Sequence, residues 1–158
     1  MIPQIAPSPL SFALERLHDI QPEVNQLWAL HYAETEGYRG APMIPQLDQF
    51  YRMEDAGMWR QFTARDDVDG HLVGHLGYMV HVGRHTGVLT ATEDFFYLRK
   101  EYRGGYNALR LLRFAIGRLK AEGCKQIGMS SKMTNDIEPL LKRVGFDLVA
   151  KFYTMAVD

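Results

Sequence analysis

An arginine followed by two glycines, Arg103-Gly104-Gly105, lies between a strand-like run and a helix-like run of the chain. The first backbone N–H groups of a helix have no acceptor inside the helix, and the helix dipole adds partial positive charge there. Such a helix start binds phosphate or diphosphate groups, and glycines let the backbone approach the anion closely. Residues 103–108 therefore predict an anion-binding loop, to which the Arg103 guanidinium could add a bidentate contact. The alternative is an ordinary strand-to-helix turn, and the glycines alone do not decide between the two.

Asp94 is the first candidate for a general base. It opens the run DFFYL just before the loop, and the two-residue period of a strand places it on the same face as Phe96 and Leu98. Apolar surroundings raise the pKa of a carboxylic acid toward a value that suits proton transfer. The alternative is a carboxylate at the start of a strand that binds a loop amide. Glu93 would point to the opposite face and is the weaker candidate.

His31 and Glu34 form a second group that could move protons or bind a substrate. They are three residues apart in a helical pattern, so their side chains would be neighbours on one face. His31 falls on the apolar stripe of that helix, and a histidine in such a place is often a packed core residue. The acidic neighbour favours a functional interpretation without deciding it.

Other kinds of site are not supported. No Lys-Ser/Thr pair follows the glycines, as a Walker loop requires, and the GxGxxG spacing of a dinucleotide fold is absent. His71 and His75 lie four residues apart on one predicted strand, which separates them by about 13 Å, too far to share one ion. We therefore expect no metal site. Cys124 is expected to be a small buried residue rather than a nucleophile.

Hydrophobic periodicity indicates an alternation of helices and strands that would position these residues. Val24, Leu27, Trp28 and His31 follow helical spacing, whereas residues 71–82 alternate as a strand does. The expected elements are helical segments from Ser11 to about Gly37 and over 47–55, strands over 58–65, 71–82 and 88–99, a helix ending at Gly123, a strand over 124–130, a helix ending at Val144 and a last strand over 146–157. This order predicts an α/β (α+β) fold, with a mixed, mostly antiparallel sheet and helices on both faces.

Length and composition fit one globular domain. The chain has 158 residues, of which 46% are apolar and 23% charged. We expect residues 1–10 to form an N-terminal arm and residues 11–158 a single domain. A net charge of −1 argues against a general nucleic-acid binder, and no apolar run is long enough to cross a membrane. The lack of a secretory signal and the single cysteine favour the cytoplasm.

The stretch DFFYLRKEYRGGYNALRLL resembles the acetyl-CoA loop of the GNAT superfamily of N-acetyltransferases, whose pattern is Arg/Gln-x-x-Gly-x-Gly/Ala. Arg103 matches the first position and Ala108 the last, whereas Tyr106 stands where the family usually has glycine. The order of elements and the ending LLKRVGF are also similar to the family. More narrowly, HYAETEGYR, EDFFYLRKEYRGG and RVGFDLVAKFY resemble small acetyltransferase-like proteins encoded by tailed phages.

The resemblance implies roles for several residues. The backbone at Phe96 and Leu98 would bind the pantetheine arm of acetyl-CoA and polarise the thioester carbonyl. The diphosphate would lie on the loop, and Asn135 would contact the same molecule. The loop residues so implied are Arg103, Gly104, Gly105, Tyr106, Asn107 and Ala108.

The resemblance does not identify a general acid in this chain. Many family members have a tyrosine four residues before the Gly-Phe pair of the last helix, and this chain has Leu141 there. Tyr153 and Tyr97 are the alternatives, and each could equally be a packed aromatic residue.

Two functions remain open at this stage. The first is transfer of an acetyl group from acetyl-CoA to a primary amine of a small molecule or a protein. The second is a domain of the same fold without catalysis, which binds a partner or forms part of a phage virion; Tyr106 and Leu141 favour it. In either case an edge strand could pair two copies in a homodimer, and a phage-encoded protein would work in the host cytoplasm.

Overall fold

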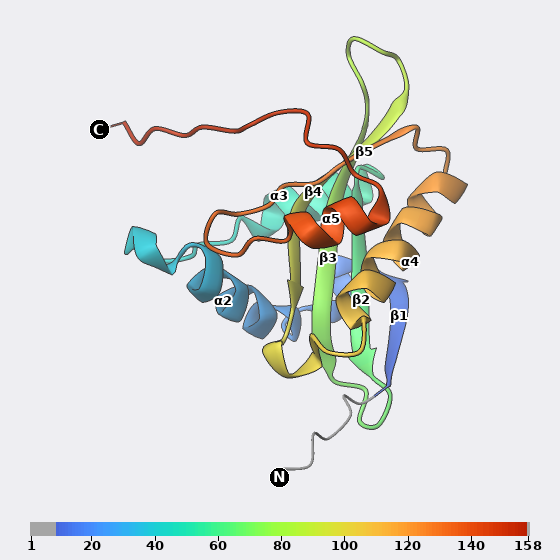
Figure 1. The fold of residues 1–158 in the computed structure, drawn as a ribbon. Helices are drawn as coiled ribbons and strands as arrows, with labels where there is room; N and C mark the ends of the chain where they lie inside the picture. The colour runs from blue at the N-terminus through green and yellow to red at the C-terminus, as the bar shows by residue number, and fades with distance from the viewer. Residues whose placement is uncertain (1–8, 158) are drawn as a thin grey trace.

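The computed structural model describes residues 9–157, which form a five-stranded sheet with helices on both faces (Figure 1). The strands follow one another in the sheet in chain order; the first four pair antiparallel, and the last pairs parallel with its neighbour. The strands are β1 (Leu10–Glu15), β2 (Trp59–Asp66), β3 (Leu72–Val82), β4 (Leu89–Leu98) and β5 (Gln126–Gly128). The helices are α1 (Leu17–Ile20), α2 (Val24–Thr35), α3 (Leu47–Asp55), α4 (Asn107–Ala121) and α5 (Glu138–Val144), with short 3-10 turns η1 (Gly37–Arg39) and η2 (Lys100–Tyr102). The predicted fold class is confirmed.

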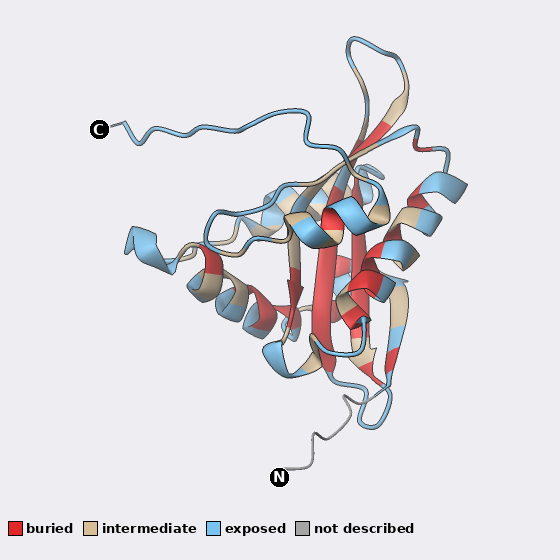
Figure 2. Ribbon diagram, in the orientation of Figure 1, coloured by how far each residue is buried: buried red, intermediate tan, exposed pale blue. Residues whose placement is uncertain are grey.

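The sheet separates two apolar cores. On one face, α4 and α5 cover β1 to β4 through leucines at helical spacing, among them Leu112 and Leu119, which are fully buried. On the other face, α1, α2 and α3 pack through residues such as Leu27 and Trp28. Figure 2 shows the buried residues along the central strands and on the sides of the helices that face them. This arrangement holds α2 and the start of α4 close to the end of β4.

The N-terminal part of the domain differs from the prediction. The helical pattern expected from Ser11 is wrong, because residues 10–15 form β1, which pairs antiparallel with β2 along its whole length. Phe12 packs against Phe114 of α4 with ring centroids 6.1 Å apart, so the alternating pattern of the strand fits the core. Of the arm expected over residues 1–10, residues 1–8 lie outside the described part of the chain.

The last strand expected over residues 146–157 is also wrong. Gly145 adopts a left-handed conformation after α5, and Phe146 packs against the core. From Asp147 to Val157 the chain has no regular secondary structure and runs away from the sheet (Figure 1). Alternating apolar residues favour an extended backbone, but a strand also needs a partner, and no described strand pairs with this segment.

Candidate active site

The loop between β4 and α4 has the shape expected of an anion site. After η2 the chain passes through Gly104 and Gly105 and enters α4 at Asn107. Gly105 and Tyr106 both have positive φ, at 63° and 62°. Glycine adopts such a conformation at little cost, but tyrosine does not. The position at which the family usually has glycine thus keeps the left-handed backbone despite its side chain.

Several backbone amides of this loop are free. Within the described chain, the N–H groups of Gly104, Gly105, Tyr106, Ala108 and Leu109 donate no hydrogen bond to another group of the protein. Residues 104–106 are also exposed to solvent. Free amides at the start of a 15-residue helix carry its positive dipole end, which suits a diphosphate.

Strands β4 and β5 separate next to this loop. Their parallel pairing covers only Thr90 to Thr92 of β4 and ends at Gly128 of β5, whereas β4 continues to Leu98. No described strand pairs with this edge of β4 over residues 93–98. Phe96 and Leu98, which the sequence assigned to the pantetheine arm, lie on this open part, and their side chains join the core below α4. The backbone edge of β4 is thus available to an extended ligand.

Arg103 does not leave its guanidinium free for an anion. It donates to both carboxylate oxygens of Glu34 on α2, at 2.9 and 2.8 Å, and its Nε donates to the carbonyl of Leu98 at 2.7 Å. It also lies over the ring of Tyr97, 5.3 Å from the centroid. The bidentate contact predicted for a ligand is made with Glu34, so Arg103 ties the loop to α2.

Glu34 is engaged by this ion pair and not by His31. The hydrogen bonds from Arg103 lower the pKa of Glu34, which stays an ionised partner of the arginine. The His31 ring instead stacks on Tyr97, with centroids 5.2 Å apart. The side-chain pair that helical spacing suggested is not formed as a hydrogen bond.

Two asparagines assigned to the cofactor have different surroundings. The Asn107 side chain is buried and donates to the Tyr102 carbonyl at 3.0 Å, so it holds the loop rather than a ligand. Asn135 lies in a turn three residues before α5, where its amide donates to the Lys132 carbonyl at 3.1 Å. Its side chain is half-buried and makes no hydrogen bond within the described residues.

Asp94 forms a β-bulge. Phe95 lies opposite Gly77 of β3, and Glu93 lies opposite Tyr78, so Asp94 has no opposite residue. The bulge shifts the alternation of β4 by one residue. The prediction that Asp94 shares a face with Phe96 and Leu98 is therefore wrong: Asp94 and Phe95 line a pocket on the α2 side of the sheet.

This pocket, which we call the α2–β4 pocket, has a volume of about 230 Å³. It lies where β4 and β5 diverge, because Asp94 comes from β4 and Lys132 from the loop after β5. Its lining residues are Trp28, His31, Tyr32, Thr35, Glu36, Met43, Pro45, Phe50, Asp94, Phe95 and Lys132. Four of these residues are Trp, Tyr or Phe, and three are charged.

The environment sets the protonation of the two candidate bases in this pocket. Asp94 is accessible to solvent, yet the neighbouring protein atoms remove enough water to raise its pKa, against a smaller lowering by Lys132. Burial lowers the pKa of His31 to about 4, so its ring is neutral at pH 7. A carboxylate and a neutral imidazole therefore face the same space.

His75 lies behind His31 and is fully buried. Neither of its ring nitrogens has a hydrogen-bond partner within the described chain. Its ring packs on Phe95, with centroids 4.5 Å apart, and meets His31 edge-on at 6.0 Å. Burial holds the pKa of His75 well below its usual value, so it acts as a neutral packing residue.

The remaining candidates lie elsewhere. Glu93 accepts hydrogen bonds from the amide and hydroxyl of Ser130, at 3.1 and 3.0 Å, and so links β4 to the loop after β5. Tyr153 is 83% exposed in the C-terminal segment and lines neither of the cavities described here. Leu141, at the position of the family's usual acid, is buried in α5. Within residues 9–157, no group of three or more His, Cys, Asp or Glu side chains could hold a metal ion, and no helix there is long and apolar enough to cross a membrane.

Sequence reasoning missed the aromatic walls of the α2–β4 pocket and Lys132. Phe50 and Phe95 line one cavity only because of the bulge and the packing of α3. It also missed Arg143 of α5, whose guanidinium lies 4.9 Å from the centroid of the Tyr106 ring beside the loop. No local signal marks these residues, because each contact joins segments distant in sequence.

Similar folds occur in known acetyltransferase structures. A ribosomal-protein-alanine N-acetyltransferase from Brucella melitensis biovar Abortus 2308 is 20% identical, with a TM-score of 0.75, over 95% of this chain and 99% of that one. A predicted acetyltransferase with acetyl-CoA from Clostridium acetobutylicum is 13% identical, with a TM-score of 0.69, over 94% and 96% of the two chains. Glucosamine-6-phosphate N-acetyltransferase from Arabidopsis thaliana is 10% identical, with a TM-score of 0.65, over 96% and 100%. At these identities the likeness concerns the fold.

The sequence itself carries the family assignment. No curated protein sequence matches this chain significantly. The family model described as "Acetyltransferase (GNAT) family" matches residues 24–146, which contain the loop, the separated strands and the α2–β4 pocket. The chain therefore belongs to the GNAT family of acetyltransferases.

Proposed function

We propose that this protein is an N-acetyltransferase that transfers the acetyl group of acetyl-CoA to a primary amine. The observation that carries this proposal is the set of free amides at Gly104, Gly105, Tyr106, Ala108 and Leu109, beside the open edge of β4. These groups fit the diphosphate and the pantetheine arm of acetyl-CoA. A reducing cytoplasm, in which Cys124 stays a thiol, is the proposed setting.

Acetyl-CoA supplies an acyl group activated as a thioester. In the proposed arrangement, the free amides of the loop bind its diphosphate, and Arg103 keeps the loop against α2 through Glu34. The backbone of β4 near Phe96 would donate to the carbonyl oxygen on which negative charge develops. Asn135 would contact the same molecule from the other side of the gap between the strands.

Asp94 is the proposed acceptor of the amine proton. A primary ammonium ion must lose one proton before its nitrogen can attack, and a nearby base speeds this loss. The C–N bond then forms as the C–S bond breaks, and the second amine proton is available to the leaving thiolate through water. His31, neutral at pH 7, can take part in the same proton transfer. Because the pKa of Asp94 is raised, we expect the rate to fall on acidification at a pH above its ordinary value of 3.8.

Anion binding by the loop is tested with two substitutions that differ in charge but hardly in size. Gly105→Asp and Gly105→Asn introduce side chains of nearly equal size, and both residues tolerate positive φ. The aspartate repels a diphosphate, so we expect acetyl-CoA to bind the Asp variant at least tenfold more weakly than the Asn variant, by calorimetry. Equal affinities, or no binding to the unaltered protein at millimolar acetyl-CoA, would contradict the proposal.

The base is tested after binding is established. Asp94→Asn should keep acetyl-CoA binding and lower kcat for an amine by about 100-fold or more, in line with the usual contribution of a general base. An unchanged kcat would remove Asp94 from the mechanism.

The rival proposal, a non-catalytic domain with a virion partner, rests on Tyr106 and Leu141. Tyr106 keeps the conformation that glycine usually provides, with φ at 62°, which weakens that argument. Leu141 still leaves the family's usual acid without a replacement. Binding of acetyl-CoA without turnover of any amine would favour the rival.

A further inference from the structure

Most of the polar side chains in the α2–β4 pocket already have partners. The Tyr32 hydroxyl donates to the Ala41 carbonyl at 3.1 Å, and the Thr35 hydroxyl donates to the His31 carbonyl at 3.0 Å. Lys132 is ion-paired with Glu36 at 2.6 Å. These groups have little capacity left for a ligand.

Glu36 is ion-paired with both Arg39 and Lys132, so two polar side chains remain for a ligand. Within the described residues, the Asp94 carboxylate and the His31 ring make no hydrogen bond. The indole N–H of Trp28 also has no partner, but it is shielded from solvent. The pocket thus offers one negative group and one neutral base, which suits one ammonium group.

The walls of the pocket are apolar and largely aromatic. Trp28 lies 5.5 Å from Phe50 and 5.9 Å from Phe95 between ring centroids, and Phe50 and Phe95 are 6.3 Å apart. Met43 and Pro45, from the segment before α3, complete these walls. Faces and edges of aromatic rings at such distances favour a further ring.

We propose that the acceptor is a small primary amine with one aromatic ring and no other strongly polar group, an arylalkylamine. This inference rests on the proposed acetyltransferase function and names its substrate class. The ammonium group would lie at Asp94, and the ring would pack among Trp28, Phe50 and Phe95. An amino sugar or a polyamine would lose water from its further polar groups without gaining partners, which costs about 1–3 kcal/mol for each group.

The selectivity of the acceptor site is tested with 2-phenylethylamine, glucosamine and spermidine, which all carry a primary amine. We expect kcat/KM for 2-phenylethylamine to exceed that for the other two by at least 100-fold. Phe50→Ala should raise KM for 2-phenylethylamine about tenfold. Tyr51→Ala is the matched control, because Tyr51 lies on the same helix, packs on His18 at 4.1 Å and does not line the pocket.

Binding separates this inference from the proposed function. The Asp94→Asn variant should bind 2-phenylethylamine more weakly, whereas 2-phenylethanol, which lacks the charge, should bind both forms equally weakly. If acetyl-CoA binds and glucosamine or spermidine is the better acceptor, the substrate class is wrong and the acetyltransferase survives. If acetyl-CoA does not bind, the proposed function itself fails.

A different observation concerns the C-terminal segment. The segment has no regular secondary structure and contains many apolar residues, and its large apolar side chains are exposed. They are Leu148 (68% exposed), Val149 (90%), Phe152 (92%), Tyr153 (83%), Met155 (82%) and Val157 (80%). Six such side chains within ten residues form a surface that soluble proteins normally cover.

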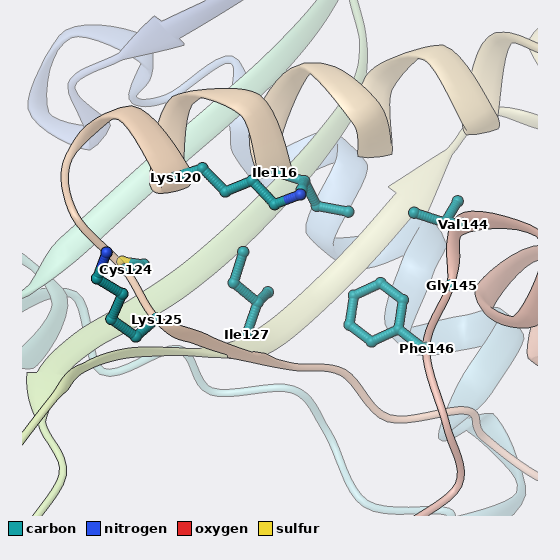
Figure 3. A pocket seen from close by; sticks show the side chains of 8 residues that line it. All are labelled: Ile116, Lys120, Cys124, Lys125, Ile127, Val144, Gly145 and Phe146. Carbon is teal, nitrogen blue, oxygen red and sulfur yellow. The ribbon is translucent and has the colours of Figure 1, made fainter. Parts of the chain in front are cut away.

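An open sheet edge and a cavity lie at β5. β5 is the last strand in the sheet order, and no described strand pairs with its outer edge. Beside it is a cavity of about 220 Å³ between α4, β5 and the end of α5 (Figure 3). Ile116, Ile127, Val144 and Phe146 give it an apolar wall, and Lys120 and Lys125 also line it.

We infer that the C-terminal segment of a second copy of this chain pairs with β5 and covers this cavity, in a reciprocal homodimer. The segment starts at Phe146 in the cavity and then leaves its own body (Figure 1). Because the two copies are related by a two-fold axis, the partner's segment would in turn lie on β5 and the cavity of the first copy. Phe152 and Tyr153 alone would bury about 300–500 Å² per copy, and both copies together approach the area of a weak specific interface.

Sedimentation of the protein at concentrations between 1 and 200 μM tests this reciprocal homodimer. We expect a two-chain mass for the full chain and a one-chain mass for Phe152→Asp and for a chain ending at Asp147. Met133→Asp is the matched control, because Met133 is 100% exposed outside the segment, and it should remain a dimer. A one-chain mass of the full chain at every concentration would overturn the inference, and so would a dimer that persists without the segment.

Discussion

Tyr106 is the residue at which this chain departs most clearly from its family and yet keeps the family's geometry. Its φ of 62° is the only positive value among the non-glycine residues of the described chain. The side chain is 63% exposed, and Arg143 lies over its ring. A left-handed conformation costs a non-glycine residue about 1–2 kcal/mol, so the loop is held in place by its surroundings.

The strain at Tyr106 can be measured by comparing two truncations. Tyr106→Ala and Tyr106→Gly both remove the ring and its contact with Arg143, but only glycine accepts positive φ freely. We expect the Gly variant to be about 1 kcal/mol more stable than the Ala variant in urea unfolding, with acetyl-CoA affinity retained. An Ala variant of equal or greater stability would show that the position is not strained.

Local sequence revealed some of the site but not its contacts. The loop at 103–108 and the base candidates could be found, because glycines, helix starts and isolated carboxylates are local signals. The pairing of Arg103 with Glu34 could not be found, since it joins residues 69 positions apart. The same limit hid the pocket role of Phe95, which depends on how β3 pairs with β4.

At the scale of elements, periodicity predicted the strands and helices that pack on both faces. It failed at the two ends of the domain. The pattern predicts a helix from Ser11, because the strand partner of β1, residues 61–66, lies about fifty residues away and leaves no local signal. Residues 147–157 were read as a strand because alternation alone cannot show whether a pairing partner exists.

The aromatic packing beside the bulge in β4 depends on a glycine in the neighbouring strand. A Cβ atom at Gly77 would lie 2.5 Å from the Trp59 ring and 2.6 Å from the Phe95 ring, closer than atoms can approach. These rings are packed on each other with centroids 5.4 Å apart, so neither can move freely. Gly77 therefore makes room for the aromatic wall behind the α2–β4 pocket.

We expect Gly77→Ala to destabilise the protein by about 1–3 kcal/mol through overpacking. Gly117→Ala is the control, because no atom lies within 4 Å of its added Cβ on α4. That change should stabilise the helix by about 0.5–1 kcal/mol. Urea unfolding of both variants at one pH measures the contrast, and a neutral Gly77→Ala would mean that the rings can yield.

At the scale of the whole molecule, the two histidines under α2 should make the fold sensitive to acid. The pKa of His31 falls from 6.5 to about 4 on folding, because burial disfavours the charged ring, and that of His75 falls well below 6.5. Above pH 6.5 neither histidine makes the stability depend on pH. As the pH falls below 6.5 the unfolded chain binds protons that the folded chain does not, so stability decreases down to the folded pKa.

Because of His31 alone, the free energy of unfolding should fall by about 3 kcal/mol as the pH is lowered from 6.5 to 4. His75→Phe should reduce the loss on acidification relative to the unaltered protein. It should also raise stability at pH 7 by about 1 kcal/mol, because it removes two buried nitrogens without partners. Urea unfolding at pH 7 and pH 4.5 gives both quantities, and parallel pH curves for the two proteins would contradict the prediction.

Asp94 is supernumerary in its strand, and this has a genetic consequence. Apart from Asp94, all residues of β4 from Leu89 to Leu98 lie opposite a residue of β3. Deletion of the Asp94 codon would therefore leave all remaining pairs in register. We expect a chain without Asp94 to fold and to bind acetyl-CoA, yet to acetylate no amine, whereas deletion of Tyr97 should unfold it. Circular dichroism and calorimetry distinguish the two deletions. The insertion or deletion of one residue at this point of β4 would then be enough to gain or lose catalysis during evolution, while the fold stays the same.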